Sequence, residues 1–200
     1  QRKYYLENLY DLLDLIVKLK VDNDFRFPIN ENVKQSLKQI FKQNQNYVGI
    51  APGAGEKNKI WPIQNYIEIC RYLEAKDCIL IFYLGPNEKE YEEILKSNFK
   101  RAIFLENELL LSKYSNIEII MTSTKFLKFA ISNDSGVSHM LSTNYCPLIK
   151  LFGPKDSKKF TPKIKNLITI SSSEVNSDRV EDIKVSRVIK TIEDMKFINV

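Results

Sequence analysis

The stretch ISNDSGVSH, residues 131–139, runs from apolar residues into a polar segment and closes on the only histidine of the chain. Apolar residues dominate positions 126–132, which predicts a buried strand, whereas residues 135–143 have the pattern of a helix. The connecting residues 133–136 are of types that favour turns and helix caps. A strand that passes directly into a helix in this way is typical of α/β sheets, where ligands bind at the loops that follow strands.

Strands and helices alternate on both sides of this stretch. The predicted strands are residues 47–51, 78–84, 102–105, 126–132, 147–152 and 167–170. The predicted helices are residues 62–75, 88–97, 116–124, 135–143 and 185–197. This alternation implies a parallel sheet with helices on both faces, so the predicted fold class is α/β.

The first 46 residues lack this alternation. Residues 1–27 carry apolar side chains at three- and four-residue spacing from Tyr5 to Leu19, which predicts an amphipathic helix. Residues 28–46 are interpreted as a linker with Pro28, followed by a second helix that Val33 and Leu37 mark. The sequence begins at Gln1, without an initiator methionine, in what looks like the middle of a helical pattern. We therefore expect the chain to be part of a longer protein.

Composition narrows the class of protein. The chain has 200 residues, 44% of them hydrophobic, which suffices for a substantial core, and no apolar segment approaches the about 18 residues that span a bilayer. Its net charge of +5 comes from lysines interspersed with acidic residues, which favours a solvated surface over nucleic-acid binding. Cys70, Cys78 and Cys146 lack metal-binding spacing and fit buried thiols in a reducing compartment. We expect a cytoplasmic protein with no nucleic-acid partner.

The loop APGAGEKNKIWP, residues 51–62, follows the first strand of the alternating region. Its glycines allow a ligand close to the backbone, and Lys57 and Lys59 offer positive charge. A surface loop in which Trp61 fills the core accounts for the same residues. The loop has neither the Walker phosphate-binding pattern nor the Gly-x-Gly-x-x-Gly pattern of dinucleotide enzymes, which argues against an ATPase and against hydride transfer.

The loop LGPNEKE, residues 84–90, follows the next strand and places Glu88 at the start of a helix. A carboxylate in this position can accept hydrogen bonds from a ribose. Glu88 can also simply stabilise the positive end of its own helix, and its spacing alone favours this second interpretation.

The polar segment after the strand at 126–132 offers a third ligand contact. A helix that begins at Ser135 or Gly136 leaves its first amide N–H groups available to an anion such as phosphate. Ser135 adds a hydroxyl, His139 lies one turn further on, and Asp134 stands at the mouth of this site. The alternative is structural, with Asp134 and Ser135 as helix caps and His139 as a half-buried helix residue.

The sequence resembles the C-terminal half of glycosyltransferase family 9, the ADP-heptose:lipopolysaccharide heptosyltransferases. The segments that carry this resemblance are, in order, APGA, K-x-W-P, LGPNEKE, ISNDSGVSHM and LFGPKDSKKFTP. The resemblance implies the C-terminal domain of a GT-B fold, in which two Rossmann-like domains face each other. It assigns residues 47–200 to the nucleotide-sugar-binding domain and residues 28–46 to a linker and connecting helix. Residues 1–27 then resemble the last helix of an otherwise missing N-terminal domain.

The resemblance also implies roles for individual residues. Lys59 is similar to the lysine that contacts the donor phosphates, and Glu88 to the acidic residue that holds the ribose, with Asn87 as the competing position. The residues that match the family motif around the pyrophosphate and sugar are Asp134, Ser135, Gly136, Val137 and His139. Residues 140–143 lack the small alanines common in the family, and residues 114–117 match its base-binding region only loosely. The sugar and the base are therefore left open.

The implied reaction is the inverting transfer of a heptose or similar sugar from a nucleotide-diphosphate sugar, such as ADP-heptose, to a lipopolysaccharide-core or related glycan acceptor. It uses no cofactor and no metal. The family's general base lies in the N-terminal domain, so no catalytic residue is assigned, and the isolated chain is expected to bind donor without turnover. The expected partners are that N-terminal domain and, peripherally, the inner face of the bacterial inner membrane. The alternatives are a different nucleotide sugar and a non-catalytic nucleotide-binding module.

Overall fold

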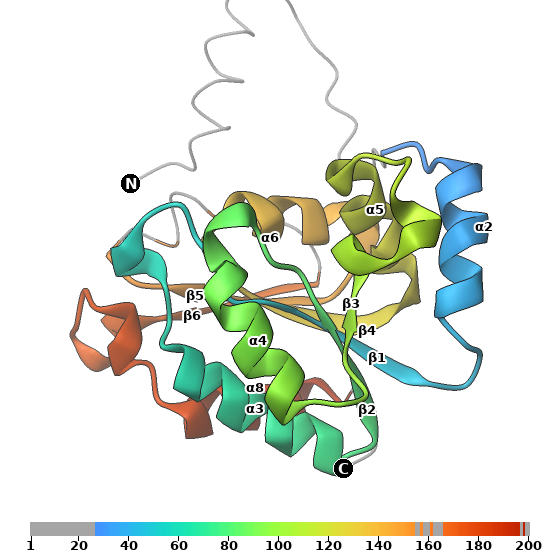
Figure 1. Cartoon of the computed structure of the whole chain (residues 1–200). Helices are drawn as coiled ribbons and strands as arrows, with labels where there is room; N and C mark the ends of the chain where they lie inside the picture. The colour runs from blue at the N-terminus through green and yellow to red at the C-terminus, as the bar shows by residue number, and fades with distance from the viewer. Residues whose placement is uncertain (1–26, 155–156, 158–160, 162–165, 197, 199–200) are drawn as a thin grey trace, which may run out of the picture.

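The structure is a computed structural model that describes residues 27–154, 157, 161, 166–196 and 198. At its centre, six parallel strands form one sheet in the order β3-β2-β1-β4-β5-β6 (Figure 1). The strands are β1 (Asn46–Ala51), β2 (Cys78–Phe82), β3 (Ile103–Phe104), β4 (Leu127–Asn133), β5 (Leu148–Phe152) and β6 (Leu167–Ser171). The predicted parallel sheet is confirmed.

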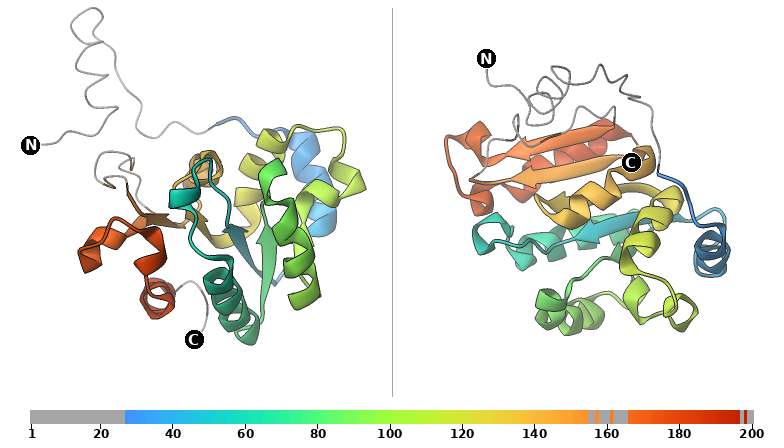
Figure 2. Two further views of the ribbon diagram at one scale, coloured as in Figure 1. Left: turned by 60° about the vertical axis from the view of Figure 1, so that its left-hand side comes forward. Right: turned by 90° about the horizontal axis from the view of Figure 1, so that it is seen from above.

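Helices cover both faces of this sheet (Figure 1 and Figure 2). The α-helices are α2 (Glu31–Ile40), α3 (Ile63–Ala75), α4 (Lys89–Asn98), α5 (Asn116–Ser123), α6 (Gly136–Leu141) and α8 (Val185–Met195). On one face α3, α4 and α8 form a core with the strands through residues such as Leu73 and Ile192. On the other face α2, α5 and α6 form a second core through residues such as Leu37 and Leu141. The α/β class predicted from the sequence is therefore confirmed.

Short 3-10 helices fill several connections. They are η1 (Lys57–Lys59), η2 (Pro86–Glu88), η3 (Leu105–Asn107), η4 (Leu109–Leu111), η5 (Thr124–Phe126), η6 (Thr143–Tyr145), η7 (Ser172–Val175) and η8 (Val180–Asp182). Four of them, η2, η3, η5 and η6, shorten elements that the sequence predicts as longer. The helix predicted for residues 116–124 ends at Ser123, because Thr124 begins η5, and the helix predicted for residues 135–143 ends at Leu141, because Thr143 begins η6. The helix predicted from Glu88 begins at Lys89, because Glu88 still belongs to η2. The strand predicted for residues 102–105 is reduced to β3, because Leu105 begins η3.

The helix predicted within residues 28–46 is α2. Asn30 caps it, since its side-chain oxygen accepts hydrogen bonds from the amides of Asn32 and Val33. The amphipathic helix predicted for residues 1–27 lies outside the described residues, and the division of the chain into domains stays a prediction. Within the described ranges, no helix has the length and apolar character needed to cross a membrane.

The three cysteines are buried, and none forms a disulfide, as their positions in apolar runs predicted. Burial raises the pKa of the Cys146 thiol to about 12. Burial and the charge of Asp77 raise that of Cys78 to about 11. These thiols therefore stay protonated at neutral pH and serve as small apolar side chains in the core.

The chain reverses its direction of winding at the centre of the sheet. From β1 the sheet grows through β2 to β3 on one side, whereas β4, β5 and β6 lie on the other. The carboxyl ends of β1 and β4 are adjacent, because Ala51 pairs with Ser132. In open α/β sheets ligands bind at such a switch point, outside the carboxyl ends of the strands. The loops that leave β1 and β4 are two of the three that the sequence singled out.

Candidate functional site

The fully buried side chain of Asn133, at the end of β4, holds the loop after β1 in place by hydrogen bonds. Its Nδ2 donates to the carbonyl of Pro52 at 2.6 Å. Its Oδ1 accepts from the amide of Trp61 at 3.2 Å and from the hydroxyl of Tyr66 at 3.0 Å. Trp61 is buried and donates through Nε1 to the carbonyl of Ile183 at 2.9 Å, so it fills the core as the structural interpretation of the loop predicted. The lysines of the loop are thus carried on a fixed backbone.

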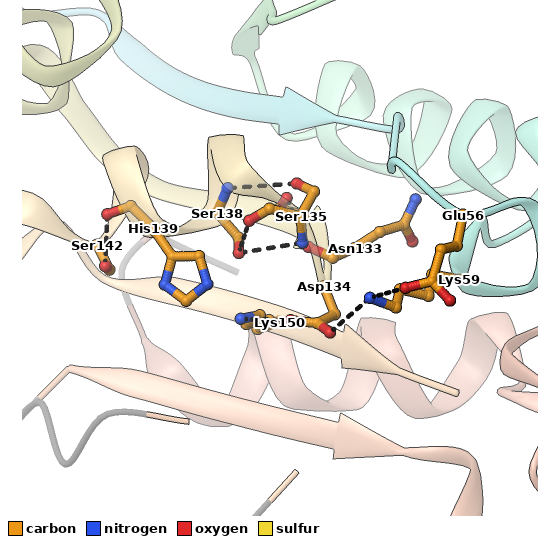
Figure 3. A network of polar contacts seen from close by, with 10 residues as sticks. Glu56, Lys59, Asn133, Asp134, Ser135, Ser138, His139, Ser142 and Lys150 are labelled. Carbon is orange, nitrogen blue, oxygen red and sulfur yellow. Dashed lines mark hydrogen bonds and ion pairs between the residues drawn. The ribbon is translucent and has the colours of Figure 1, made fainter. Parts of the chain in front are cut away.

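A cluster of charged side chains lies at the carboxyl ends of β1, β4 and β5 (Figure 3). Asp134, directly after β4, is its centre. Its Oδ1 lies 2.7 Å from the Nζ of Lys150, and its Oδ2 lies 3.6 Å from the Nζ of Lys59. Lys59 is also paired with Glu56, at 2.6 Å between Nζ and Oε1. Asp134 therefore stands between two cations, of which Lys150 is the nearer.

Lys150 belongs to this cluster although the sequence analysis did not single it out. It is in the middle of β5, where the apolar residues of LIKLF surround it, and it is only 1% exposed. It pairs in register with Ser132 of β4. The signal available in the sequence was a single lysine inside a strand that otherwise reads as fully buried. A buried charge needs a partner, and Asp134 provides it.

The two lysines respond to their surroundings in opposite ways. Burial on its own lowers the pKa of Lys59, but the hydrogen bonds and negative charges of Glu56 and Asp134 outweigh it, so the pKa is raised above its ordinary value. Burial lowers the pKa of Lys150; Asp134 opposes this effect and the charge of Lys59 adds to it. Lys59 is therefore a firmly protonated amine at the edge of the site, and Lys150 is a buried amine whose protonation depends on Asp134.

Helix α6 begins at Gly136, as predicted, and Ser135 is its N-cap. The Ser135 Oγ accepts from the amide of Ser138 at 3.3 Å, and the Ser138 Oγ donates to the carbonyl of Ser135 at 2.6 Å. The structural interpretation of Ser135 as a cap is thus confirmed. Gly136 is exposed, and a Cβ added there meets no atom within 4 Å. Its φ is not positive, so the backbone does not require glycine here.

Val137 and His139 lie on different sides of α6. Val137 packs against the core that α2, α5 and α6 share. His139 is exposed, and its ring is directed to the side of α6 where Lys150 and Asp134 lie (Figure 3). The surrounding protein and the charge of Lys150 lower the pKa of His139, while Asp134 acts in the opposite direction. The imidazole is therefore neutral at pH 7 and can donate or accept one hydrogen bond.

Glu88 belongs to η2, which follows β2, and it lies beside Gly53 at the start of the loop after β1. Its Oε2 accepts a hydrogen bond from the amide of Gly85 at 2.7 Å, so its contact is local but stabilises the start of η2 and not, as predicted, the start of the following helix, α4. Its Oε1 is close to Gly53, where an added Cβ would lie 2.4 Å from this oxygen. Both glycines are therefore packed against the Glu88 carboxylate.

A cavity of about 410 Å³ opens beside Glu88. Lys57 and Asn87 line it together with Glu88, and Lys59 is not among its lining residues. The structure thus separates the predicted site residues into two groups. Lys59 joins Asp134 in the charged cluster near α6, whereas Glu88 joins Lys57 at the cavity. The loop after β1 connects the two groups, because it contributes residues to both.

Comparisons with known proteins show the family of this chain. Residues 5–187 match the family described as glycosyltransferase family 9 (heptosyltransferase). Lipopolysaccharide heptosyltransferase 1 of Campylobacter coli is 29% identical over 196 residues, which cover 96% of this chain and 55% of that protein. The chain therefore spans about half the length of this curated relative.

Solved structures share the fold. A family 9 glycosyl transferase from Veillonella parvula superposes with a TM-score of 0.81 at 15% identity, over 98% of this chain and 60% of that one. The E. coli heptosyltransferase WaaC, in a structure with ADP, gives 0.72 at 17% identity, over 97% of this chain and 57% of that one. These similarities confirm the predicted fold, the Rossmann-like α/β fold of GT-B glycosyltransferase structures. With the family match over most of its length, the chain belongs to glycosyltransferase family 9, the heptosyltransferases.

Proposed function

We propose that this chain is the donor-binding half of an inverting heptosyltransferase and that it holds the diphosphate of a nucleotide sugar at the charged cluster beside α6. The cluster of Lys59, Asp134 and Lys150 at the switch point of the sheet carries this proposal. Membership of the family supports glycosyl transfer in lipopolysaccharide biosynthesis as the reaction class. The donor proposed is ADP-heptose or a related nucleotide-diphosphate sugar.

Lys59 is the group best placed to meet the diphosphate. Its side chain is 17% exposed, and that of its closest partner, Glu56, is 50% exposed. Exchange of this partner for a phosphate oxygen replaces one charge-assisted hydrogen bond with another. The first-turn amides of Gly136 and Val137 and the hydroxyl of Ser135 lie on the same side of the site and would add to the binding of a phosphate.

The nucleoside is proposed to occupy the cavity beside Glu88. A volume of about 410 Å³ lies within the range of small-molecule sites. Glu88 lines this cavity, and of its two carboxylate oxygens the Oε2 is engaged by the amide of Gly85. In this arrangement Glu88 accepts a hydrogen bond from a ribose hydroxyl, with Asn87 beside it. The transferred sugar would then lie near Asp134 and His139, on the other side of the diphosphate.

The reaction follows from this placement. A deprotonated acceptor hydroxyl attacks the anomeric carbon, the bond from that carbon to the diphosphate oxygen breaks, and the electron pair leaves with the nucleoside diphosphate. The negative charge that grows on this leaving group is what the protein must stabilise. Lys59 can do so without any change of its own protonation. The general base, the glycan acceptor and the N-terminal domain that contributes them in the family are part of the proposal for the whole protein.

Calorimetric titration of the chain with ADP, UDP, GDP and CDP tests the proposal. We expect ADP to bind best and to raise the melting temperature, because it binds the folded state alone. A preference for another base supports a different nucleotide sugar as donor. If none of the four diphosphates, nor a sugar conjugate of any, gives heat, the proposed function is wrong.

A further inference from the structure

Lys150 cannot contact a donor directly, because its side chain is only 2% exposed. It is held from two sides. The Asp134 carboxylate lies 2.7 Å from its amine, and the ring of Phe152 lies 4.8 Å away, centroid to nitrogen. Ser132, its partner in register on β4, is small and leaves room for the lysine under α6. Its ion pair within the site is therefore with Asp134.

Asp134 is the natural competitor of a bound diphosphate. It is a carboxylate 3.6 Å from the amine of Lys59, which is the same amine that the diphosphate needs. A carboxylate free to turn fully toward Lys59 would close this gap to a direct ion pair of the kind that Lys59 already makes with Glu56. In the structure it does not, because its nearer partner is Lys150.

We propose that Lys150 is a positioning residue that holds Asp134 away from Lys59 and so keeps Lys59 available to the donor diphosphate. This inference rests on the proposed function and adds a specificity-determining residue to it.

The experiment compares Lys150→Met in two backgrounds. In the natural chain we expect Lys150→Met to weaken ADP binding by about tenfold, and adenosine binding, which lacks the phosphate charge, by less than about twofold. In the Asp134→Asn background the competitor is absent, so Lys150→Met should change ADP affinity by less than about twofold. The matched control is Lys128→Met, which removes an exposed lysine of β4 and should leave ADP binding unchanged.

Three outcomes overturn the role of Lys150. They are an equal loss of ADP affinity in both backgrounds, no loss in the natural background, and an Asp134→Asn chain that binds no ADP, since Asp134 is proposed to compete with the diphosphate and not to assist it. If Lys150→Met alone fails to fold, the comparison of Asp134→Asn with Asp134→Asn/Lys150→Met still decides. A large loss of ADP affinity in that pair contradicts the inference, and equal affinities support it.

The only histidine of the chain gives a readout that needs no ligand. His139 faces Lys150 and Asp134, and its pKa is lowered first by the surrounding protein, which displaces water, and then by the positive charge of Lys150. Titration of its ring protons by NMR should therefore show a higher pKa in Lys150→Met than in the natural chain. An unchanged pKa would mean that Lys150 is an uncharged packing residue. Absence of ADP binding by the natural chain contradicts the proposed function itself, whereas ADP binding without coupling to Asp134 contradicts only the inference about Lys150.

Discussion

Two acidic residues from other segments flank the loop after β1 and are held in different ways. Glu88 of η2 lies beside Gly53 at one end of the loop, and Asp134, which follows β4, lies beside Lys59 near the other. At one end Glu88 accepts its hydrogen bond from Gly85, three residues away on the same turn. At the other end Asp134 pairs with Lys150 on the next strand and with Lys59 on the loop that leaves a third. The first arrangement depends on a local turn and the second on the assembled sheet. Substitutions at the two ends should therefore have effects of different size.

Asp134→Ala should have the largest effect on stability. It leaves the buried amine of Lys150 without its carboxylate, and removal of one partner of a buried pair typically lowers the free energy of unfolding by about 3–5 kcal/mol. Glu56→Ala removes the other carboxylate partner of Lys59, which is half exposed, and should cost only about 0–1 kcal/mol. Urea denaturation of both variants measures the difference. Equal effects would show that the Asp134–Lys150 pair is not a buried tertiary contact.

Lys59→Ala should have the next largest effect, on binding. Loss of a hydrogen bond to a charged group should weaken ADP binding by about 1.5–3 kcal/mol and leave the fold intact. Lys57→Ala is the matched control, because Lys57 lies on the same 3-10 helix η1 but lines the cavity beside Glu88. Calorimetry with ADP ranks the two. If Lys57→Ala causes the larger loss, the diphosphate binds at the Glu88 end of the loop.

The same contrast explains what the sequence could predict. Strands, helix starts and helix caps depend on residues that are neighbours in the sequence. The sequence therefore predicted the strands and the cap by Ser135, and it placed the start of α6 at Ser135 or Gly136. Burial of Trp61 also followed, because a large apolar side chain in a polar loop has few other places to go.

The partnership of Lys150 and Asp134 was not visible in the same way. It requires β5 to lie next to β4 in one particular register, and this depends on the whole sheet. The different positions of Lys57 and Lys59 were equally hidden, because the turn of η1 decides which lysine faces the charged cluster and which faces the cavity. Local sequence patterns alone therefore do not predict contacts between distant elements.

The variant Gly136→Ala tests whether glycine at the start of α6, beside the charged cluster, serves ligand binding or folding. Gly136 is exposed, has no positive φ and has open space around it, so alanine should leave the melting temperature unchanged or raise it slightly. If a phosphate approaches the amides of this turn, the new methyl group should weaken ADP binding at least about tenfold, or about 1.4 kcal/mol. Thermal unfolding and calorimetry on this one variant give both values. Unchanged affinity would mean that the start of α6 is a cap and not a phosphate contact.

The smallest effect is expected from Gly53→Ala, at the Glu88 end. The new Cβ would lie 2.4 Å from the Oε1 of Glu88, so the carboxylate must move and weaken its bond to the amide of Gly85. The displaced atoms are the end of a flexible side chain, and we expect a loss of only about 1 kcal/mol in the free energy of unfolding. Gly55→Ala is the matched control, because a Cβ at Gly55 meets nothing within 4 Å.

A second substitution tests whether Glu88 alone is responsible. The three atoms nearest to the added Cβ at Gly53 all belong to the end of the Glu88 side chain, so Glu88→Ala removes these three contacts at once. Gly53→Ala should therefore cost nothing in a Glu88→Ala background, as measured by urea denaturation. A cost that persists there would show that the backbone of the loop, which Asn133 fastens to β4, resists the change. The Glu88 end would then depend on the assembled sheet just as the Asp134 end does.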